Sequence, residues 1–108
     1  MLATEAAVKV VHDQSKSVFF ADLNDQRAVL HYRIKPPADG EQGGTAAIDM
    51  YHTEVPPAFR GRGIAKQLAQ AAFDFAAAEN LRVIPTCSYI QKFAQDTPIC
   101  EYRNLVSS

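Results

Sequence analysis

The segment 55–66, with the sequence VPPAFRGRGIAK, holds the residue types and spacing with the clearest chemical meaning in this chain. It leaves a predicted strand, turns through Gly61 and Gly63, and opens a predicted helix, whose first N–H groups are unpaired and carry a partial positive charge. The glycines let the backbone approach a ligand closely because they have no Cβ. Three basic side chains add positive charge: Arg60, Arg62 and Lys66. The sequence therefore predicts a phosphate or pyrophosphate site here.

The spacing of the glycines limits which phosphate ligand this loop can bind. A P-loop needs four residues between its glycines, followed by Lys and Ser or Thr, and this segment lacks them. A dinucleotide-binding fingerprint needs a third glycine where Lys66 stands, so that match is partial. The plainer alternative is a tight turn before a helix with a solvated basic face. The surrounding order of strand, loop, alanine-rich helix and short strand favours the anion site.

The first half of the chain has the alternation and turn composition of β-strands. Four strands are predicted there: Val8–His12, Val18–Ala21, Ala28–Ile34 and Ala46–Val55. The polar turn Asp13–Ser17 joins the first two strands into a hairpin. The Pro- and Gly-rich segment Pro36–Thr45 is predicted to be an exposed loop.

The hydrophobic period changes after the loop. Apolar residues recur at helical spacing at Ile64, Leu68, Ala71, Ala72, Phe75 and Ala76. Asn80 is a predicted helix stop, Leu81–Pro85 a buried strand, and 89–95 a short helix. A right-handed crossover makes the two strands that flank the long helix parallel within an otherwise antiparallel sheet. The predicted fold class is α+β, or mixed α/β.

The segment 55–66 resembles the Arg/Gln-x-x-Gly-x-Gly/Ala signature of the GNAT superfamily of acyl-CoA-dependent N-acetyltransferases. Its match lies at Arg60, Gly63 and Ala65, with Val55 at the strand end five residues before Arg60. In such proteins the loop amides hold the coenzyme A pyrophosphate, and the end of the preceding strand bonds the acetyl carbonyl and pantetheine. The resemblance implies a GNAT-like fold and an acetyl-CoA site at Val55, Arg60, Gly61, Arg62, Gly63, Ile64, Ala65 and Lys66.

Two further stretches, His52–Pro56 and Ile84–Tyr89, resemble the minimal stand-alone GNAT-like domains. Larger members of the superfamily have a helical pair that walls one side of the acceptor site, but only five residues separate the first two predicted strands here. Ala94 stands about where the usual family tyrosine, an acid, would fall. These departures bear on which acceptor is bound and on how the proton is transferred. They do not change the coenzyme A binding that the resemblance implies.

Cys87 is one candidate catalytic residue. Acetyl transfer from a thioester to an amine needs a deprotonated amine, a polarised carbonyl and a protonated leaving thiolate. Cys87 follows the strand that should lie beside the strand ending at Val55, so it is expected near the thioester. It could be a nucleophile that forms an acetyl-cysteine or the acid that protonates the coenzyme A sulfur; the alternative is a buried apolar residue. Tyr89 and Phe93 could line the acyl or pantetheine channel, or belong to the core.

A polar pair on the long strand supplies the other candidates. His52 and Glu54 are two residues apart, so their side chains share a face, whereas Asp49 and Thr53 are expected to face the other way. Glu54 could accept the amine proton directly or through water, and His52 could serve as a base or pair with Cys87. The alternative is a polar pair at a strand end with no catalytic role.

Whole-chain properties restrict the remaining functions. The 108 residues predict a single domain, 1–108, and a net charge of −1 argues against nucleic-acid binding. No apolar run approaches the roughly 20 residues of a membrane span, and a signal peptide is not expected. Cys87 and Cys100 are expected to be reduced thiols in the cytoplasm, and their separation from any histidine predicts no metal site.

Three functions fit these observations. The favoured one is an acetyl-CoA-dependent N-acetyltransferase, whose amine acceptor the residues do not identify. The others are a non-catalytic acyl-CoA-binding or sensing module and a small interaction domain whose basic loop binds an acidic partner. Without a helical wall the acceptor groove is expected to be open, which favours a peptide or protein amine.

Overall fold

The computed structural model describes residues 9–23, 25–37, 46–59, 61, 63–96 and 105–106. The strands are β1 (Val10–Asp13), β2 (Val18–Leu23), β3 (Gln26–Lys35), β4 (Ala47–Glu54) and β5 (Arg82–Ile84). The helices are α1 (Ile64–Ala78) and α2 (Ser88–Asp96), and Pro57–Phe59 forms the 3-10 turn η1. In these ranges no helix is both long and apolar enough to cross a bilayer.

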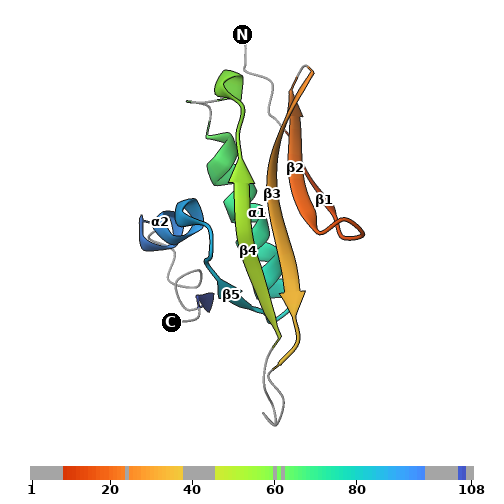
Figure 1. Ribbon diagram of the computed structural model, residues 1–108, viewed down its shortest axis with the longest axis vertical. Helices are drawn as coiled ribbons and strands as arrows, with labels where there is room; N and C mark the ends of the chain where they lie inside the picture. The colour runs from red at the N-terminus through yellow and green to blue at the C-terminus, as the bar shows by residue number, and fades with distance from the viewer. Residues whose placement is uncertain are drawn as a thin grey trace.

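The five strands form one sheet in the order β1-β2-β3-β4-β5 (Figure 1). The first four pair antiparallel, and β5 pairs in parallel with β4 after the crossover through α1. This arrangement confirms the predicted element order and the α+β class. Residues 14–17 form a turn between β1 and β2, so no helical pair is inserted there.

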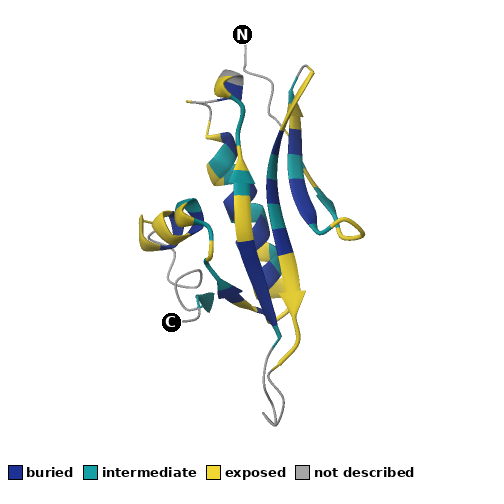
Figure 2. Cartoon of the chain, in the orientation of Figure 1, coloured by how far each residue is buried: buried dark blue, intermediate teal, exposed yellow. Residues whose placement is uncertain are grey.

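The hydrophobic core lies between the sheet and α1. Alternate residues of β3 face it, and Ala28, Leu30 and Tyr32 are at most 3% exposed. The buried stripe of α1 consists of Ile64, Leu68, Ala69, Ala72, Phe73 and Ala76. Figure 2 shows the buried segments of α1 behind β3 and β4. Ala71 and Phe75, which the period places in the stripe, are half-buried at its edge.

The second helix packs against the first. The rings of Phe73 on α1 and Phe93 on α2 lie 5.2 Å apart between centroids. α1 ends as predicted, because Asn80 adopts a φ of 57° and the N–H of Leu81 donates to the carbonyl of Ala76 at 2.8 Å. This cap turns the chain back into β5, from which α2 follows after a short turn.

The sheet face opposite α1, here named the open face, is not crossed by either described helix (Figure 1). His31 and Arg33 of β3 point to it, because they alternate with the buried residues of that strand. Tyr51 and His52 of β4 join them: His31 and His52 stack at 6.0 Å, and the Arg33 guanidinium lies 4.3 Å from the Tyr51 ring centre. A polar and aromatic surface therefore runs along the middle of the sheet.

A β-bulge at Tyr51 changes which residues of β4 share a face. His31 pairs with His52 while Tyr32 pairs with Met50, so Tyr51 is one extra residue in β4. The prediction that Asp49 faces away from His52 is therefore wrong, since an inserted residue reverses the alternation on one side of it. Asp49 pairs with Arg33 and lies on the open-face side, whereas Thr53 pairs with Leu30 and faces the core.

The edge strand β1 is attached to the core through His12. Its ring stacks on Phe19 with centroids 3.9 Å apart and meets the edge of Phe75 at 4.5 Å. Its Nε2 lies 2.6 Å from the hydroxyl of Tyr32. Burial lowers the pKa of His12 from its usual 6.5, and the Asp13 carboxylate opposes only part of that shift.

We expect the free energy of unfolding to fall as the pH drops below about 6.5, because the unfolded chain then binds a proton at His12 more readily than the folded chain. This stabilisation is fully present when the pH is above the usual pKa of histidine. It is lost as the pH falls through the lowered pKa of His12 in the folded chain. Thermal unfolding measured between about pH 7.5 and pH 5 checks this slope. His12→Phe should reduce the slope, and an unchanged slope in this variant would contradict the expectation.

Candidate functional site

The loop before α1 has the backbone geometry of an anion site. Gly61 and Gly63 adopt φ values of 81° and 73°, in the left-handed region that side chains rarely enter. Gly63 is the N-cap of α1 and no side chain caps the helix; the first turn closes when the N–H of Gln67 donates to the Gly63 carbonyl at 3.0 Å. The N–H groups of the preceding helical residues have no partner within the helix, so they are available to a ligand.

A pocket of about 270 Å³ lies over this loop. Its lining consists of Val55, Phe59, Gly61, Gly63, Ile64, Ala65, Lys66 and Tyr89. A Cβ built on either glycine would meet nothing within 4 Å, so the space beside both is open. Six of the eight predicted acetyl-CoA-binding residues line one pocket, and the remaining two, Arg60 and Arg62, lie outside the described residues.

The first turn of α2 supplies the opposite wall of the pocket. Tyr89 is half-buried there, and burial raises the pKa of its phenol, which keeps the hydroxyl neutral and able to donate a hydrogen bond. Phe93, which the sequence offered for the same channel, is in the core against Phe73. Only Tyr89 of this pair therefore contributes to the pocket.

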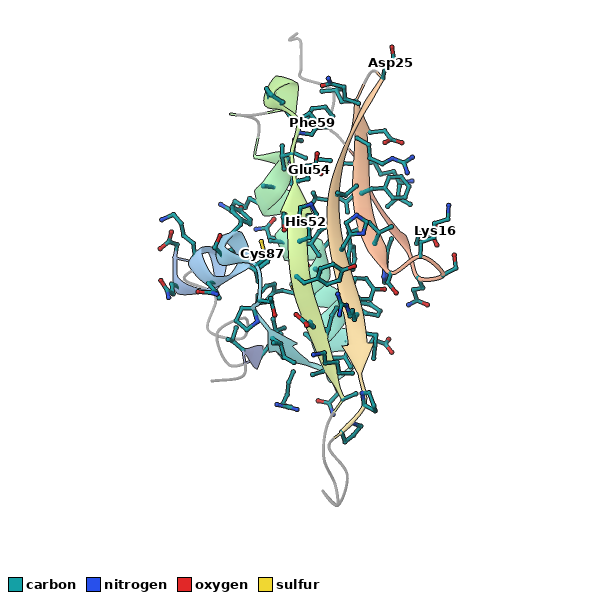
Figure 3. The ribbon with its side chains drawn as sticks, in the orientation of Figure 1. Lys16, Asp25, His52, Glu54, Phe59 and Cys87 are labelled. Atoms are coloured by element: carbon teal, nitrogen blue, oxygen red, sulfur yellow. The ribbon has the colours of Figure 1, made fainter. Side chains whose placement is uncertain are left out.

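Cys87 lies where β4 and the beginning of α2 meet (Figure 3). Its N–H donates to the Met50 carbonyl at 3.0 Å, and its half-buried thiol donates to the Thr53 hydroxyl, with Sγ and Oγ1 3.7 Å apart. Cys87 precedes Tyr89 by two residues and Thr53 precedes Val55 by two. The Cys87–Thr53 contact is therefore close in the chain to two residues of the pocket lining, although neither Cys87 nor Thr53 lines the pocket itself.

His52 and Glu54 lie on the other side of β4. Their side chains are exposed, with Nε2 of His52 3.4 Å from Oε1 of Glu54. His52 pairs with His31 and Glu54 pairs with Val29, so both side chains lie on the open face. Cys87 contacts Thr53 on the core side of the strand. The candidate residues thus form two groups on opposite faces of one strand.

Two residues of this region escaped the sequence reasoning. Thr53 was ranked below His52 by parity, although its hydroxyl is the partner of the Cys87 thiol. Thr86, immediately before Cys87, donates to the Asp49 carboxylate at 2.5 Å. The only available signal was their position beside other candidates, because the partners are 34 and 37 residues apart in the chain.

No metal centre is evident in the part of the chain that the structure describes. There, no three side chains of the His, Cys, Asp and Glu types gather as a metal ion would require.

Comparisons with known proteins agree with this architecture. A family model described as GCN5-related N-acetyl-transferase matches residues 18–105. Protein NATD1 of Xenopus tropicalis is 44% identical over 99 residues, which cover 90% of this chain and 84% of that protein. Protein NATD1 of Bos taurus is 46% identical over 97 residues and that of Homo sapiens 44% over 97, each covering 88% of this chain and 79% of the relative. The resemblance carried by segment 55–66 is confirmed, and the chain belongs to the GCN5-related N-acetyltransferase family.

Proposed function

We propose that this chain is an acetyl-CoA-dependent N-acetyltransferase formed by a single domain in the cytoplasm. The observation that carries the proposal is the pocket that Val55 and Tyr89 line together with the glycine loop and the uncapped start of α1. The Cys87–Thr53 contact, two residues from Tyr89 and from Val55 along the chain, would extend this pocket into one groove.

The groove matches the parts of acetyl-CoA in order. The free N–H groups at the start of α1, with Lys66, would bind the pyrophosphate, and Arg60 and Arg62 would add positive charge. The left-handed glycines and the open space beside them allow phosphate oxygens to approach the backbone. Val55 and Tyr89 would flank the pantetheine, which supports a thioester lying next to Cys87.

The transfer forms one C–N bond and breaks one C–S bond. The neutral amine attacks the thioester carbonyl carbon, the coenzyme A sulfur leaves, and one proton passes from the amine nitrogen to that sulfur overall. In one route the Cys87 thiol donates this proton and is reprotonated by the one that the amine loses. In the other route the Cys87 sulfur takes the acetyl group while its proton passes to the leaving coenzyme A sulfur. The amine then takes the acetyl group from Cys87, and the proton that the amine loses restores the Cys87 thiol.

The open face is the proposed entry of the acceptor. Glu54 is exposed and lies 3.4 Å from His52, on the opposite face of β4 from Cys87. It would therefore take up the amine proton through water around the end of the strand, and His52 would assist as a base. No helical pair lies between β1 and β2, and neither of the described helices covers the open face (Figure 1). This openness supports a peptide or protein amine as the acceptor, with no role for nucleic acid or membrane.

A non-catalytic acyl-CoA-binding module is the second candidate. It is favoured by Ala94, which is 6% exposed in α2 and has no acidic proton where larger relatives are expected to place a tyrosine. Release of free coenzyme A thiol, measured with a panel of amines and peptides, separates the two functions. Tight acetyl-CoA binding without thiol release in any mixture would favour the binding module.

Isothermal titration with acetyl-CoA tests the proposed site directly. Gly63→Val is expected to weaken binding by roughly 100-fold, because two hydrogen bonds to charged phosphate oxygens, at about 1.5 kcal/mol each, would be lost. The branched side chain would strain the left-handed backbone and occupy the open space beside the loop.

The control for this titration is Glu79→Ala at the far, exposed end of α1, which should bind as the wild type does. Circular dichroism should first establish that Gly63→Val retains its fold. Wild-type protein that takes up no acetyl-CoA at high ligand concentration would refute both the transferase and the binding module.

A further inference from the structure

Asp49 is the only charged side chain that is buried among the described residues. It is 6% exposed and lies on β4 between Ile48 and Met50, both fully buried. Burial of a carboxylate is unfavourable unless its oxygens are bonded. The carboxylate of Asp49 therefore requires hydrogen-bonding partners at this position.

Both oxygens of Asp49 have partners from other elements. Oδ1 accepts a hydrogen bond of 2.5 Å from the Thr86 hydroxyl, and Oδ2 lies 3.5 Å from Nζ of Lys35. A carboxylate is suited to this position because it accepts on both oxygens and matches an ammonium group. Asp49 thus ties the end of β3 and the turn after β5 to β4.

The turn held by Asp49 lies beyond the last pairing of the parallel strands. The pairing ends with Asp49 opposite Ile84, and the N–H of Thr86 then folds back to the Ile84 carbonyl at 3.0 Å. The next N–H, that of Cys87, nevertheless reaches the Met50 carbonyl at 3.0 Å. The Asp49–Thr86 hydrogen bond is a side-chain contact that keeps this turn against β4 beyond the last paired residues of the parallel strands.

We propose that Asp49 is a positioning residue for the Cys87 thiol and acts through Thr86. The Asp49–Thr86 hydrogen bond, here named the clamp, holds the Cys87 N–H against the Met50 carbonyl, one residue before the bulge at Tyr51. It thereby places the Cys87 Sγ beside Thr53. Asp49 itself lies on the other side of β4 and does not contact the reacting atoms. The consequence for acetyl transfer rests on the function proposed above, whereas the placement of the thiol does not.

The first arm of the test needs no activity. In a Cys100→Ser background, so that only one thiol reacts, Thr86→Val is expected to raise the hydrogen-exchange rate of the Cys87 amide at least tenfold and to speed alkylation of its sulfur. Exchange at Leu68 in the core reports global unfolding and should not change to the same extent. Thr86→Ser should restore both rates, and Asp22→Asn, which removes an exposed carboxylate paired with Arg27, should leave them unchanged.

The second arm measures acetyl transfer. Thr86→Val and Asp49→Asn should lower kcat by roughly 100-fold, the cost of a displacement near 1 Å at a reacting group. Their dissociation constant for acetyl-CoA should stay within about threefold of the wild type, since neither residue lines the pocket over the glycine loop. If Asp49 and Thr86 only stabilised the fold, the two variants would weaken acetyl-CoA binding, lower kcat and raise the exchange rate at Leu68 together.

Each outcome bears on the proposal. Unchanged exchange and alkylation at Cys87 in Thr86→Val would overturn the clamp. Faster exchange with an unchanged kcat would show that the clamp does not position the thiol for transfer. If the wild type binds acetyl-CoA but never transfers the acetyl group, the proposed function fails by itself, and the exchange and alkylation rates still decide whether Asp49 places the thiol.

Discussion

Cys87→Ala is expected to lower kcat for acetyl transfer by about 10²–10⁴-fold, the usual contribution of a positioned proton donor or acceptor. The thiol lies beside Thr53, two residues in the chain from Tyr89 in the pocket lining, and its removal leaves no other thiol among the described residues. Acetyl-CoA should still bind within about threefold of the wild-type affinity, since the glycine loop is untouched. The loss should therefore appear in turnover and not in binding.

The measurement is the rate of coenzyme A thiol release with the best amine acceptor. Cys100→Ala serves as the matched control and should retain wild-type turnover. Intact-mass analysis of the wild type with acetyl-CoA alone then separates the two routes: an acetyl adduct on Cys87 identifies a nucleophile, and its absence identifies a proton donor. Turnover of Cys87→Ala within threefold of the wild type would remove this residue from the mechanism.

Phe73→Ala is expected to lower the free energy of unfolding by about 3–5 kcal/mol, the cost of truncating a fully buried phenylalanine. Phe73 is 0% exposed, and its ring meets Phe93 where α1 and α2 pack together. Domains are stable by only about 5–15 kcal/mol in total, so this one change removes a large share. The loss also loosens α2, which carries Tyr89, and should weaken acetyl-CoA binding.

Chemical denaturation followed by circular dichroism measures the change in stability. Phe73→Leu keeps most of the volume and should cost less than about 1.5 kcal/mol. Glu79→Ala, on the exposed end of the same helix, should stay within about 0.5 kcal/mol of the wild type. A loss below about 1 kcal/mol for Phe73→Ala would contradict the packing described between the helices.

The helix and the loop before it were predictable from the chain alone. The apolar period starting at Ile64 requires a helix with one buried stripe, and Asn80 ends it as expected. The spacing of Gly61 and Gly63 required a turn that only glycine adopts easily, and both residues have positive φ. These features depend on residues within one or two turns of each other, so the local sequence specifies them.

The arrangement of the catalytic candidates was less predictable. Simple alternation along β4 separated His52 from Thr53 correctly but placed Asp49 on the wrong face, because the bulge at Tyr51 shifts the register. The sequence offered His52 either as a base or as a partner of Cys87, whereas the thiol donates its hydrogen bond to Thr53. A bulge depends on how two strands pair, and no pattern within one strand reports it.

The amino-acid order was therefore enough for the element sequence, the parallel crossover, the glycine turn before α1 and the family resemblance, since each follows from short-range periodicity or from a contiguous motif. The contacts Cys87–Thr53 and Asp49–Thr86 join residues 34 and 37 positions apart, and they exist only after β4 and β5 have paired and α2 has packed. Long-range pairing and the register of the bulge bring the thiol to Thr53. For that reason this contact became visible only in the folded chain.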